Sequence, residues 1–429
     1  MELASRCGMA ADGSYGGTAR ERSERWARAD PVSIERAARD RAGGGANRLT
    51  PLRFVLVFGV VSGLGDVVYE GARSVTGPVL ASFGAGAALV GLITGAGEAV
   101  ALVLRLPFGL LSDRTGRPWP ITIAGYAITM VAVPLLAVAW ALWPAAVLAV
   151  MERFGKAVRT PARDTMLAQA SIDLGRGRAF ALHEAIDQSD AVVGPLLVAA
   201  LGGLRWGFAV LVVPGGCALA LLASLRRSVP HPAACERRAQ HDPPPAAGRR
   251  EPFPRRFWLY AGYTAVNMLG FATWAVLAFH LHARHVVADS TIAIMYAVAM
   301  GLAGAGALAS GWAFDRVGLR VLLVVPALTA VVPFLSFTTT VAVAWIGAAV
   351  WGLGLGVHES TMRAAVAQLV PARRRGAGYV LLAIYGVAWL AGSTAIGASY
   401  AHSVPTAQAF DVITQAVALL AFVALLAGR

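Results

Sequence analysis

A ten-residue polar phrase occurs twice in this chain, and it constrains the fold more than any other feature. The first copy reads GLLSDRTGRP from Gly109 to Pro118, and the second reads GWAFDRVGLR from Gly311 to Arg320. The copies start 311 minus 109, or 202, residues apart in a chain of 429 residues, and each lies between two long apolar runs. Because a repeat at half the chain length indicates a duplicated unit, we expect two similar halves with a solute site where they meet.

The composition is too apolar for a soluble protein of this size. Hydrophobic residues make up 57% of the chain and charged residues 14%, whereas soluble domains carry roughly 25% charge. Apolar runs of about 20 residues, each long enough to cross a bilayer, recur along the chain. We count twelve, at residues 53–81, 88–111, 119–141, 144–168, 178–202, 205–225, 257–282, 291–313, 320–340, 342–366, 376–400 and 405–428. The prediction is an all-α membrane protein with twelve transmembrane helices in two pseudo-symmetric six-helix bundles.

The polar segments predict the domain organisation and the orientation. We expect a disordered tail at 1–50, a bundle at 51–225, a linker at 226–256 and a second bundle at 257–429. Arginine is concentrated in the tail, the linker and every second turn, and nearly absent from the alternate turns. By the positive-inside rule the arginine-rich side is cytoplasmic, so both termini lie inside a bacterial inner membrane. The net charge of +13 therefore indicates membrane orientation and not a nucleic-acid partner.

The repeated phrase resembles the loop signature of the major facilitator superfamily, Gly-x-Leu-x-Asp-Arg-x-Gly-Arg-Arg. The first copy matches at Gly109, Leu111, Asp113, Arg114, Gly116 and Arg117, and ends in Pro118 where the family has a basic residue. The second, looser copy matches at Gly311, Asp315, Arg316, Gly318 and Arg320. Gly194 and Pro195 resemble part of the antiporter signature of the same family, which favours export. The resemblance implies a transporter that works by alternating access.

The physical chemistry of the repeated turn stands beside the resemblance. Glycine permits the positive φ of a tight turn, and an aspartate among arginines forms charge-assisted bonds to a neighbouring bundle. One interpretation is therefore a conformational latch that breaks when the halves rock. The other is a purely structural turn. The latch candidates are Gly109, Asp113, Arg114, Gly116, Arg117, Asp315, Arg316 and Gly318.

Ionisable residues inside the spans are costly and point to function. The first half carries most of them, in spans 1, 2, 4 and 5, and in spans 1, 4 and 5 they form stripes along one helical face. They are Asp66, Glu70, Arg73, Glu98, Glu152, Arg153, Lys156, Arg159, His183, Asp187 and Asp190. We expect these faces to converge inside the first bundle, with a Glu152–Lys156 pair along span 4. Structural ion pairing is one role for each residue, and proton or substrate binding is the other. Asp66, Glu70 and Asp187 are the preferred proton carriers.

The second half is less charged, and its polar groups suggest a substrate surface. The candidates are Asn267, Trp274, His358 and Tyr385. Asn267 also matches Asp66 in the repeat, at an offset of 267 minus 66, or 201. For His358 the alternative is a hydrogen bond between helices.

The sequence as a whole predicts a secondary active transporter that exports a small organic solute by proton antiport. Proton-coupled uptake of a nutrient or metal chelate is the alternative, and a non-transporting membrane sensor is a remote one. Nothing in the motifs suggests an enzyme, a cofactor or a bound metal. The expected partners are a small-molecule substrate, protons and the lipid bilayer, and we expect a monomer.

Overall fold

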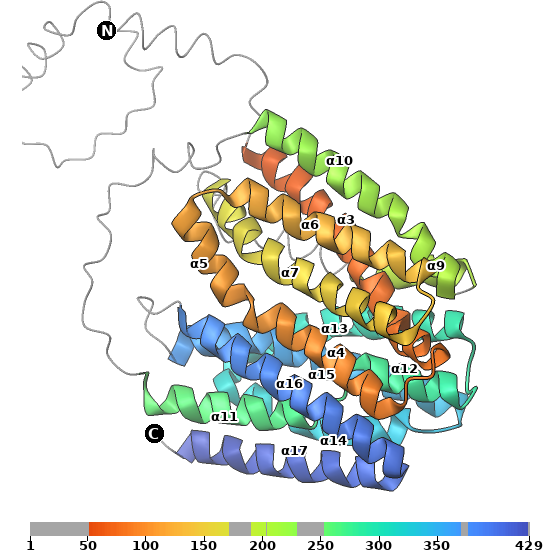
Figure 1. Ribbon diagram of the computed structural model, residues 1–429. Coiled ribbons are helices and arrows are strands. Elements are labelled where there is room, and N and C mark those ends of the chain that lie inside the picture. The colour runs from red at the N-terminus through yellow and green to blue at the C-terminus, as the bar shows by residue number, and fades with distance from the viewer. Residues whose placement is uncertain (1–50, 171–189, 203, 230–252, 370–375, 428–429) are drawn as a thin grey trace, which may run out of the picture. The chain divides into compact units, whose positions relative to one another are not determined.

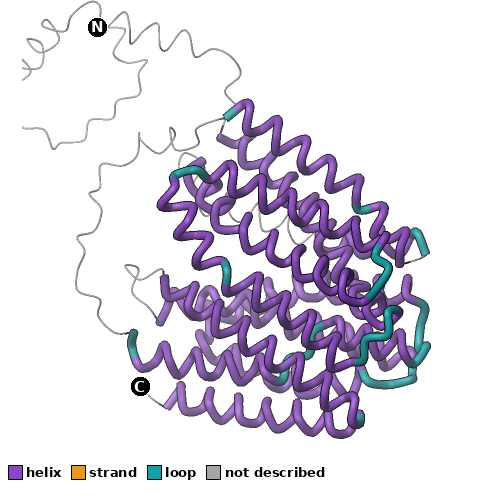
Figure 2. Tube along the Cα trace, in the orientation of Figure 1, coloured by secondary structure: helices purple, strands orange, loops and turns teal. Residues whose placement is uncertain are grey.

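Helices form all the regular structure in the part of the chain that the computed structural model describes (Figure 2). That part comprises residues 51–170, 190–202, 204–229, 253–369 and 376–427. The predicted tail, most of the predicted linker, and the candidates His183 and Asp187 lie outside the described residues.

The described residues of the first half include helices in each of the six predicted spans, with residues 178–189 of the fifth lying outside them (Figure 1). Span 2 is divided at Leu104 into α4 and α5, and span 6 into α9 and α10. The helices are α3 (Pro51–Ser82), α4 (Ala87–Val103), α5 (Arg105–Thr115), α6 (Pro118–Leu135), α7 (Leu142–Ala170), the helix Asp190–Ala200, α9 (Leu204–Val210) and α10 (Val212–Ser228).

The second half repeats the order of the first. Its seventh span is broken between Leu269 and Trp274, which separates α11 from α12. The helices are α11 (Arg255–Leu269), α12 (Trp274–Ala283), α13 (Asp289–Val317), η6 (Gly318–Leu323), α14 (Val324–Ser336), α15 (Val341–Leu369), α16 (Gly376–His402) and α17 (Val404–Ala427).

Length and composition suit these helices to a membrane. Nine helical stretches among the described residues are long and apolar enough to cross a bilayer, and one of them, Asp289–Ser336, contains both α13 and α14. The charged helix α7 and the short described helix Asp190–Ala200 complete the twelve. The chain is therefore a multi-pass membrane protein of two six-helix bundles.

Both copies of the repeated phrase form a turn with a positive-φ glycine at the same position, although the two turns differ in ψ. Gly116 ends α5 in the left-handed region, with φ 58° and ψ 20°, which costs residues with a Cβ about 1–2 kcal/mol. Gly318 ends α13 with φ 62° and ψ −143°, a region that is essentially open to glycine alone. Pro118 then begins α6, where its missing N–H costs no helical hydrogen bond. The repeated glycine is thus required by the backbone of the turn. We call the end of the bundles that carries these turns the inner end, after the predicted orientation, and the opposite end the outer end.

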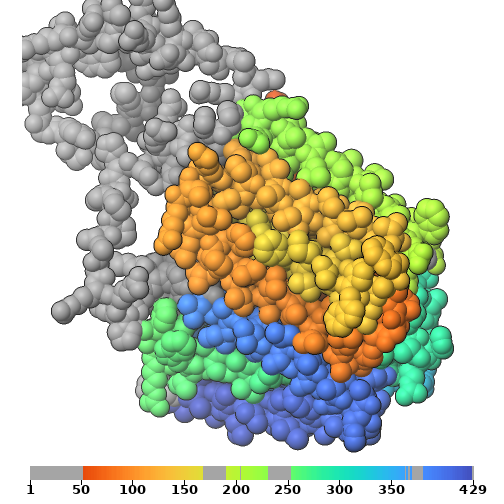
Figure 3. Space-filling model, viewed as in Figure 1, coloured from red at the N-terminus to blue at the C-terminus, as the bar shows by residue number. Residues whose placement is uncertain are grey.

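The bundles meet along the outer halves of two helix pairs. α4 runs beside α16, and α3 runs beside α12 (Figure 1). Figure 3 shows the same boundary from outside, between the orange first half and the blue second half. A Cβ on Gly91 would lie 2.1 Å from the backbone oxygen of Ser393, and one on Gly77 would lie 2.2 Å from that of Ala275. Glycine therefore allows the backbones to touch and closes the outer end.

Candidate functional site

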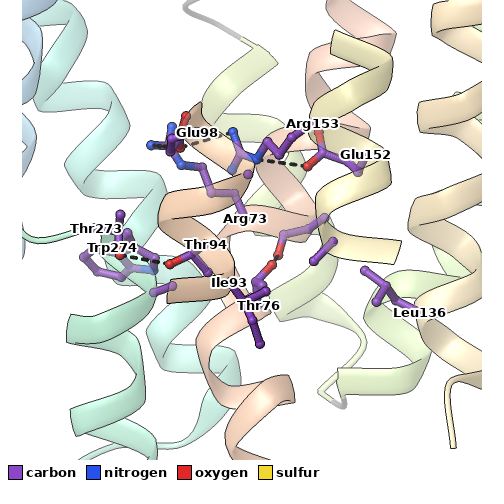
Figure 4. Close-up of a pocket in the computed structure, with 14 residues that line it drawn as sticks. Arg73, Thr76, Ile93, Thr94, Glu98, Leu136, Glu152, Arg153, Thr273 and Trp274 are labelled. Carbon is purple, nitrogen blue, oxygen red and sulfur yellow. Dashed lines mark hydrogen bonds and ion pairs between the residues drawn. The ribbon is translucent and has the colours of Figure 1, made fainter. Parts of the chain in front are cut away.

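A cavity lies between α3, α4, α7 and the start of α12 (Figure 4). Its lining includes the charged residues Arg73, Glu98, Glu152 and Arg153 and the hydroxyls of Thr76, Thr94 and Thr273. It holds room for only about two or three water molecules in this conformation. The wall is therefore polar and charged, but the bundles must move apart before a larger solute fits.

Glu98 is the centre of the charged wall. Its Oε1 lies 2.9 Å from Arg73 Nη2 on α3 and 3.2 Å from Arg153 Nη1 on α7. All three side chains are about nine-tenths buried, at 9% to 10% exposure. A carboxylate on α4 thus joins the arginines of two other helices, and Figure 4 shows them gathered at one end of the cavity.

Glu152 pairs with its sequence neighbour and not with Lys156. Arg153 Nε lies 3.1 Å from Glu152 Oε2, whereas Lys156 Nζ stands 3.5 Å from the ring centre of Tyr69. The expected Glu152–Lys156 pair is therefore absent, because the aromatic face of Tyr69 draws the ammonium away. Glu152 Oε1 is buried and has no hydrogen-bond partner among the described residues, although the residue lines the cavity.

Asp66 forms a second ion pair nearer the inner end. Arg159 Nη2 donates to Asp66 Oδ1 at 2.9 Å, and the arginine side chain is 1% exposed. Of the basic candidates on α7, it is Arg159 that pairs with Asp66. Asp190 lies against the same stretch of α3, since a Cβ on Gly63 would be 1.9 Å from its Oδ2.

We call the eight residues of the first bundle that meet here the central charge network. It contains four acids and four bases: Asp66, Glu70, Glu98, Glu152, Arg73, Arg153, Lys156 and Arg159. Since an unpaired buried charge costs several kcal/mol, the equal numbers explain how the first bundle accommodates them.

Glu70 connects the central charge network to the second bundle. The hydroxyl of Tyr296 on α13 donates to Glu70 Oε2, and Arg73 Nη1 lies 3.8 Å from the same oxygen. Two neutral hydrogen bonds join the bundles nearby, from Trp274 Nε1 to the backbone oxygen of Ser74 at 3.0 Å and between Thr94 and Thr273 at 3.2 Å. Opening of the outer end would break all three contacts.

The second bundle contributes an aromatic wall on α15 and α16. The rings of His358 and Tyr385 lie 5.1 Å apart, and those of Tyr385 and Trp389 lie 5.4 Å apart. All three side chains are buried, yet both His358 nitrogens, the Tyr385 hydroxyl and Trp389 Nε1 lack hydrogen-bond partners among the described residues. The guanidinium of Arg73 lies 5.8 Å from the Trp389 ring. This wall therefore offers unused hydrogen-bonding groups beside the central charge network.

The remaining substrate candidates have different surroundings. Trp274 lines the cavity. Asn267 instead faces α17, where its Nδ2 donates to Gln415 Oε1 at 2.8 Å. Asn267, which matches Asp66 in the repeat, is thus bonded within the second bundle and does not line the cavity.

The latch candidates lie at the inner surface. Asp113, Arg114, Gly116, Arg117, Asp315 and Arg316 are exposed. Arg316 packs on Trp312 of its own helix, with its guanidinium 3.3 Å from the ring centre. No described residue forms an ion pair with Asp113 or Asp315 in this conformation. The latch stays a prediction.

Gly194 brings span 5 against α3, because a Cβ there would lie 2.2 Å from the backbone oxygen of Val67. Pro195 follows it in the helix Asp190–Ala200. The described residues contain no group of three or more His, Cys, Asp or Glu side chains that could hold a metal ion.

Sequence reasoning missed three aromatic residues of the site. Tyr69 accepts a hydrogen bond from Arg153 Nη1, Tyr296 donates to Glu70, and Trp389 packs near Arg73. Tyr69 directly precedes Glu70 on the charged helix, and that position was an available signal. Tyr296 and Trp389 are aromatic residues in apolar spans, so their sequence surroundings carry no such signal.

Comparison with known proteins identifies similar sequences and folds. Residues 62–398 match the family model described as Major Facilitator Superfamily. An uncharacterized protein of Mycobacterium tuberculosis is 48% identical over 398 residues, which cover 91% of this chain and 97% of that protein. An uncharacterized transporter of the same family type from Methanocaldococcus jannaschii is 27% identical over 143 residues, covering 33% of this chain and 36% of that protein.

Solved transporters share the fold at low sequence identity. The nucleoside transporter NupG aligns with a TM-score of 0.69 at 11% identity, covering 87% of this chain and 99% of that one. A bacterial homolog of the human lysosomal transporter Spinster, solved inward-facing and unoccupied, aligns with a TM-score of 0.69 at 17% identity, covering 88% of this chain and 98% of that one.

Proposed function

This chain belongs to the major facilitator superfamily, and we propose that it exports a small organic solute in exchange for protons. The family membership makes it a secondary transporter and not an enzyme. The proton coupling and the direction of transport are the proposal, and the contact between Glu70 and Tyr296 carries it.

The coupling follows from what Glu70 contacts. Its carboxylate is held by Tyr296 of the second bundle and lies 3.8 Å from Arg73, which also binds Glu98 on the cavity wall. When the outer end opens, Glu70 would lose Tyr296 and become accessible to protons from the outside water. Protonation then frees Arg73 to bind Glu98 alone, and the charge presented to the solute changes with it.

The solute would lie between the charged wall of the first bundle and the aromatic wall of the second. Glu152 offers a carboxylate oxygen without a partner, and His358 and Tyr385 offer hydrogen-bonding groups that lack partners among the described residues. A polar solute with a flat apolar part suits these two walls.

Two features favour export and a latch, within the same proposal. The close packing of Gly194 on α3 next to Glu70 fits the partial antiporter signature. Asp113 and Asp315 would each pair with arginines of the opposite bundle once the inner end closes, and the arginine-rich termini would face the cytoplasm. The two bundles with their linker would work as a monomer.

The test uses purified protein in liposomes, with a solute first found by thermal stabilisation against a compound panel. Antiport predicts that an acidic vesicle interior drives solute inward, whereas the uptake alternative predicts that an acidic exterior does so. Glu70→Gln should abolish gradient-driven accumulation and retain solute–solute exchange, because only the proton step is lost.

The matched control is Asp289→Asn, which removes an acid at the outer end of the second bundle, where it pairs with His282 at 2.6 Å. It should behave like the parent protein. Accumulation that ignores the gradient in the parent, or persists in Glu70→Gln, would refute the coupling.

A further inference from the structure

A second buried acid lies outside the central charge network, on α17 of the second bundle. Asp411 is the only ionisable residue of α17 and is 0% exposed. Both of its carboxylate oxygens lack a hydrogen-bond partner among the described residues, as does Oδ1 of Asn267 on the neighbouring helix α11. Buried oxygens left in this way are costly, because their desolvation is not repaid.

The nearby amides do not satisfy Asp411. Asn267 Nδ2 donates to Gln415 Oε1 at 2.8 Å, and Gln415 Nε2 donates to the backbone oxygen of Asn267 at 3.0 Å. Thr414 Oγ1 donates to backbone oxygens of its own helix. Each of these groups thus has a bond to another acceptor, and neither it nor any other described donor reaches an Asp411 oxygen with hydrogen-bond geometry.

The neighbouring helices bring no compensating charge. α11, α14 and α16 pack against α17. Their described ionisable side chains are Arg255, Arg256, Tyr260 and Tyr263 on α11 and Tyr385, Tyr400 and His402 on α16, and α14 has none. The arginines begin α11, about 16–18 Å along the helix from Asn267. No described cation forms an ion pair with Asp411, so an ionised carboxylate here would be a lone buried charge.

The site is too crowded for a metal ion. α11 ends beside it, and a Cβ on Gly270 would lie 2.2 Å from Thr414 Oγ1, 2.4 Å from Gln415 Nε2 and 3.0 Å from Asp411 Oδ1. A cation of the sodium type needs several oxygen ligands around an open centre, whereas a proton needs no space. One acidic hydrogen also supplies the missing donor.

We propose that Asp411 is a second proton-binding site, which holds its proton while α17 is packed against the break between α11 and α12. The carboxyl O–H donates to a neighbouring acceptor and removes the lone charge. Loss of the proton would force water into this contact and separate α17 from Gly270.

The break between α11 and α12 links the packing around Asp411 to the contacts that close the outer end. Thr273 and Trp274 directly follow it, and they make the hydrogen bonds to Thr94 and to the backbone of Ser74 in the first bundle. A change of packing at Gly270 would therefore shift Thr273 and Trp274, which hold the outer ends of the two bundles together. The site works through the second bundle and does not depend on Glu70.

Infrared spectroscopy of the purified parent protein and its variants, in water and in deuterium oxide, tests the proposal without a substrate. The parent protein at neutral pH should show a C=O stretching band of a protonated carboxyl group, which shifts in deuterium oxide. Asp411→Asn should remove that band, and the control Asp289→Asn should leave it unchanged.

Gly270→Ala keeps Asp411 but pushes α17 away, so it should weaken the band while the acid is still present. Equal bands in the parent and Asp411→Asn would overturn the proposal, as would an undiminished band in Gly270→Ala. The flux test of Glu70 is separate, because its failure would leave the Asp411 band in place.

Discussion

Alanine at Gly91 should shift the protein toward an outward-open conformation. Where α4 packs against α16, the new Cβ would lie 2.1 Å from the Ser393 backbone oxygen, while ordinary van der Waals contact begins at 3.4 Å. α4 and α16 must therefore separate by 3.4 minus 2.1, or 1.3 Å. Such overpacking costs about 1–3 kcal/mol, which is about 5- to 150-fold in the equilibrium at 1.4 kcal/mol per factor of ten.

The assay measures access from outside to the cavity. A reporter cysteine replaces Thr76, which lines the cavity on α3, in a protein whose native cysteines are changed to serine. Gly91→Ala should speed its labelling by a membrane-impermeant thiol reagent by about the same 5- to 150-fold, because labelling follows the population of the open state.

The control is Gly262→Ala on α11, where an added Cβ would meet nothing within 4 Å. Both substitutions raise helix propensity equally, and the helix is formed in both conformations, so that effect cancels. Equal labelling rates in the two variants would refute the idea that the glycine contact sets the closed state.

Three further outcomes are expected. Tyr296→Phe removes the donor to Glu70, so it should raise labelling in the same thiol assay by about 10- to 150-fold, the value of a hydrogen bond to a charged group; an unchanged rate would contradict the contact. Arg159→Met leaves Asp66 buried and unpaired and should lower the free energy of unfolding by about 3–5 kcal/mol, with recovery when Asp66→Asn is added; thermal unfolding measures both. Gly116→Ala should cost about 1–2 kcal/mol in the same measurement, because φ is 58° there, and a neutral result would exclude that backbone requirement.

The helices could be predicted from the sequence because apolar length and punctuating residues are local signals. The turn glycines Gly116 and Gly318 illustrate this, since the repeated phrase marked both positions and the backbone requires them. The face shared by charges on span 4 was equally visible, because helical spacing alone determines which residues lie on one side.

Partner choice could not be predicted, since it depends on neighbours that sequence spacing does not describe. Spacing favoured Lys156 as the partner of Glu152, but Tyr69 from another helix attracts that lysine. The link from Glu70 to Tyr296 spans 226 residues of sequence. Asp411 was overlooked because a single acid in an apolar run has no pattern around it.

The balance of the central charge network has an electrical consequence. Four acids and four bases that move together with one bundle carry no net formal charge through the membrane field. A potential of 100 mV acts on a moved unit charge with about 2.3 kcal/mol, so the rocking of this cluster would itself be nearly insensitive to voltage. The current of a transport cycle would then come from the proton and the solute, and the reversal potential would report their ratio directly.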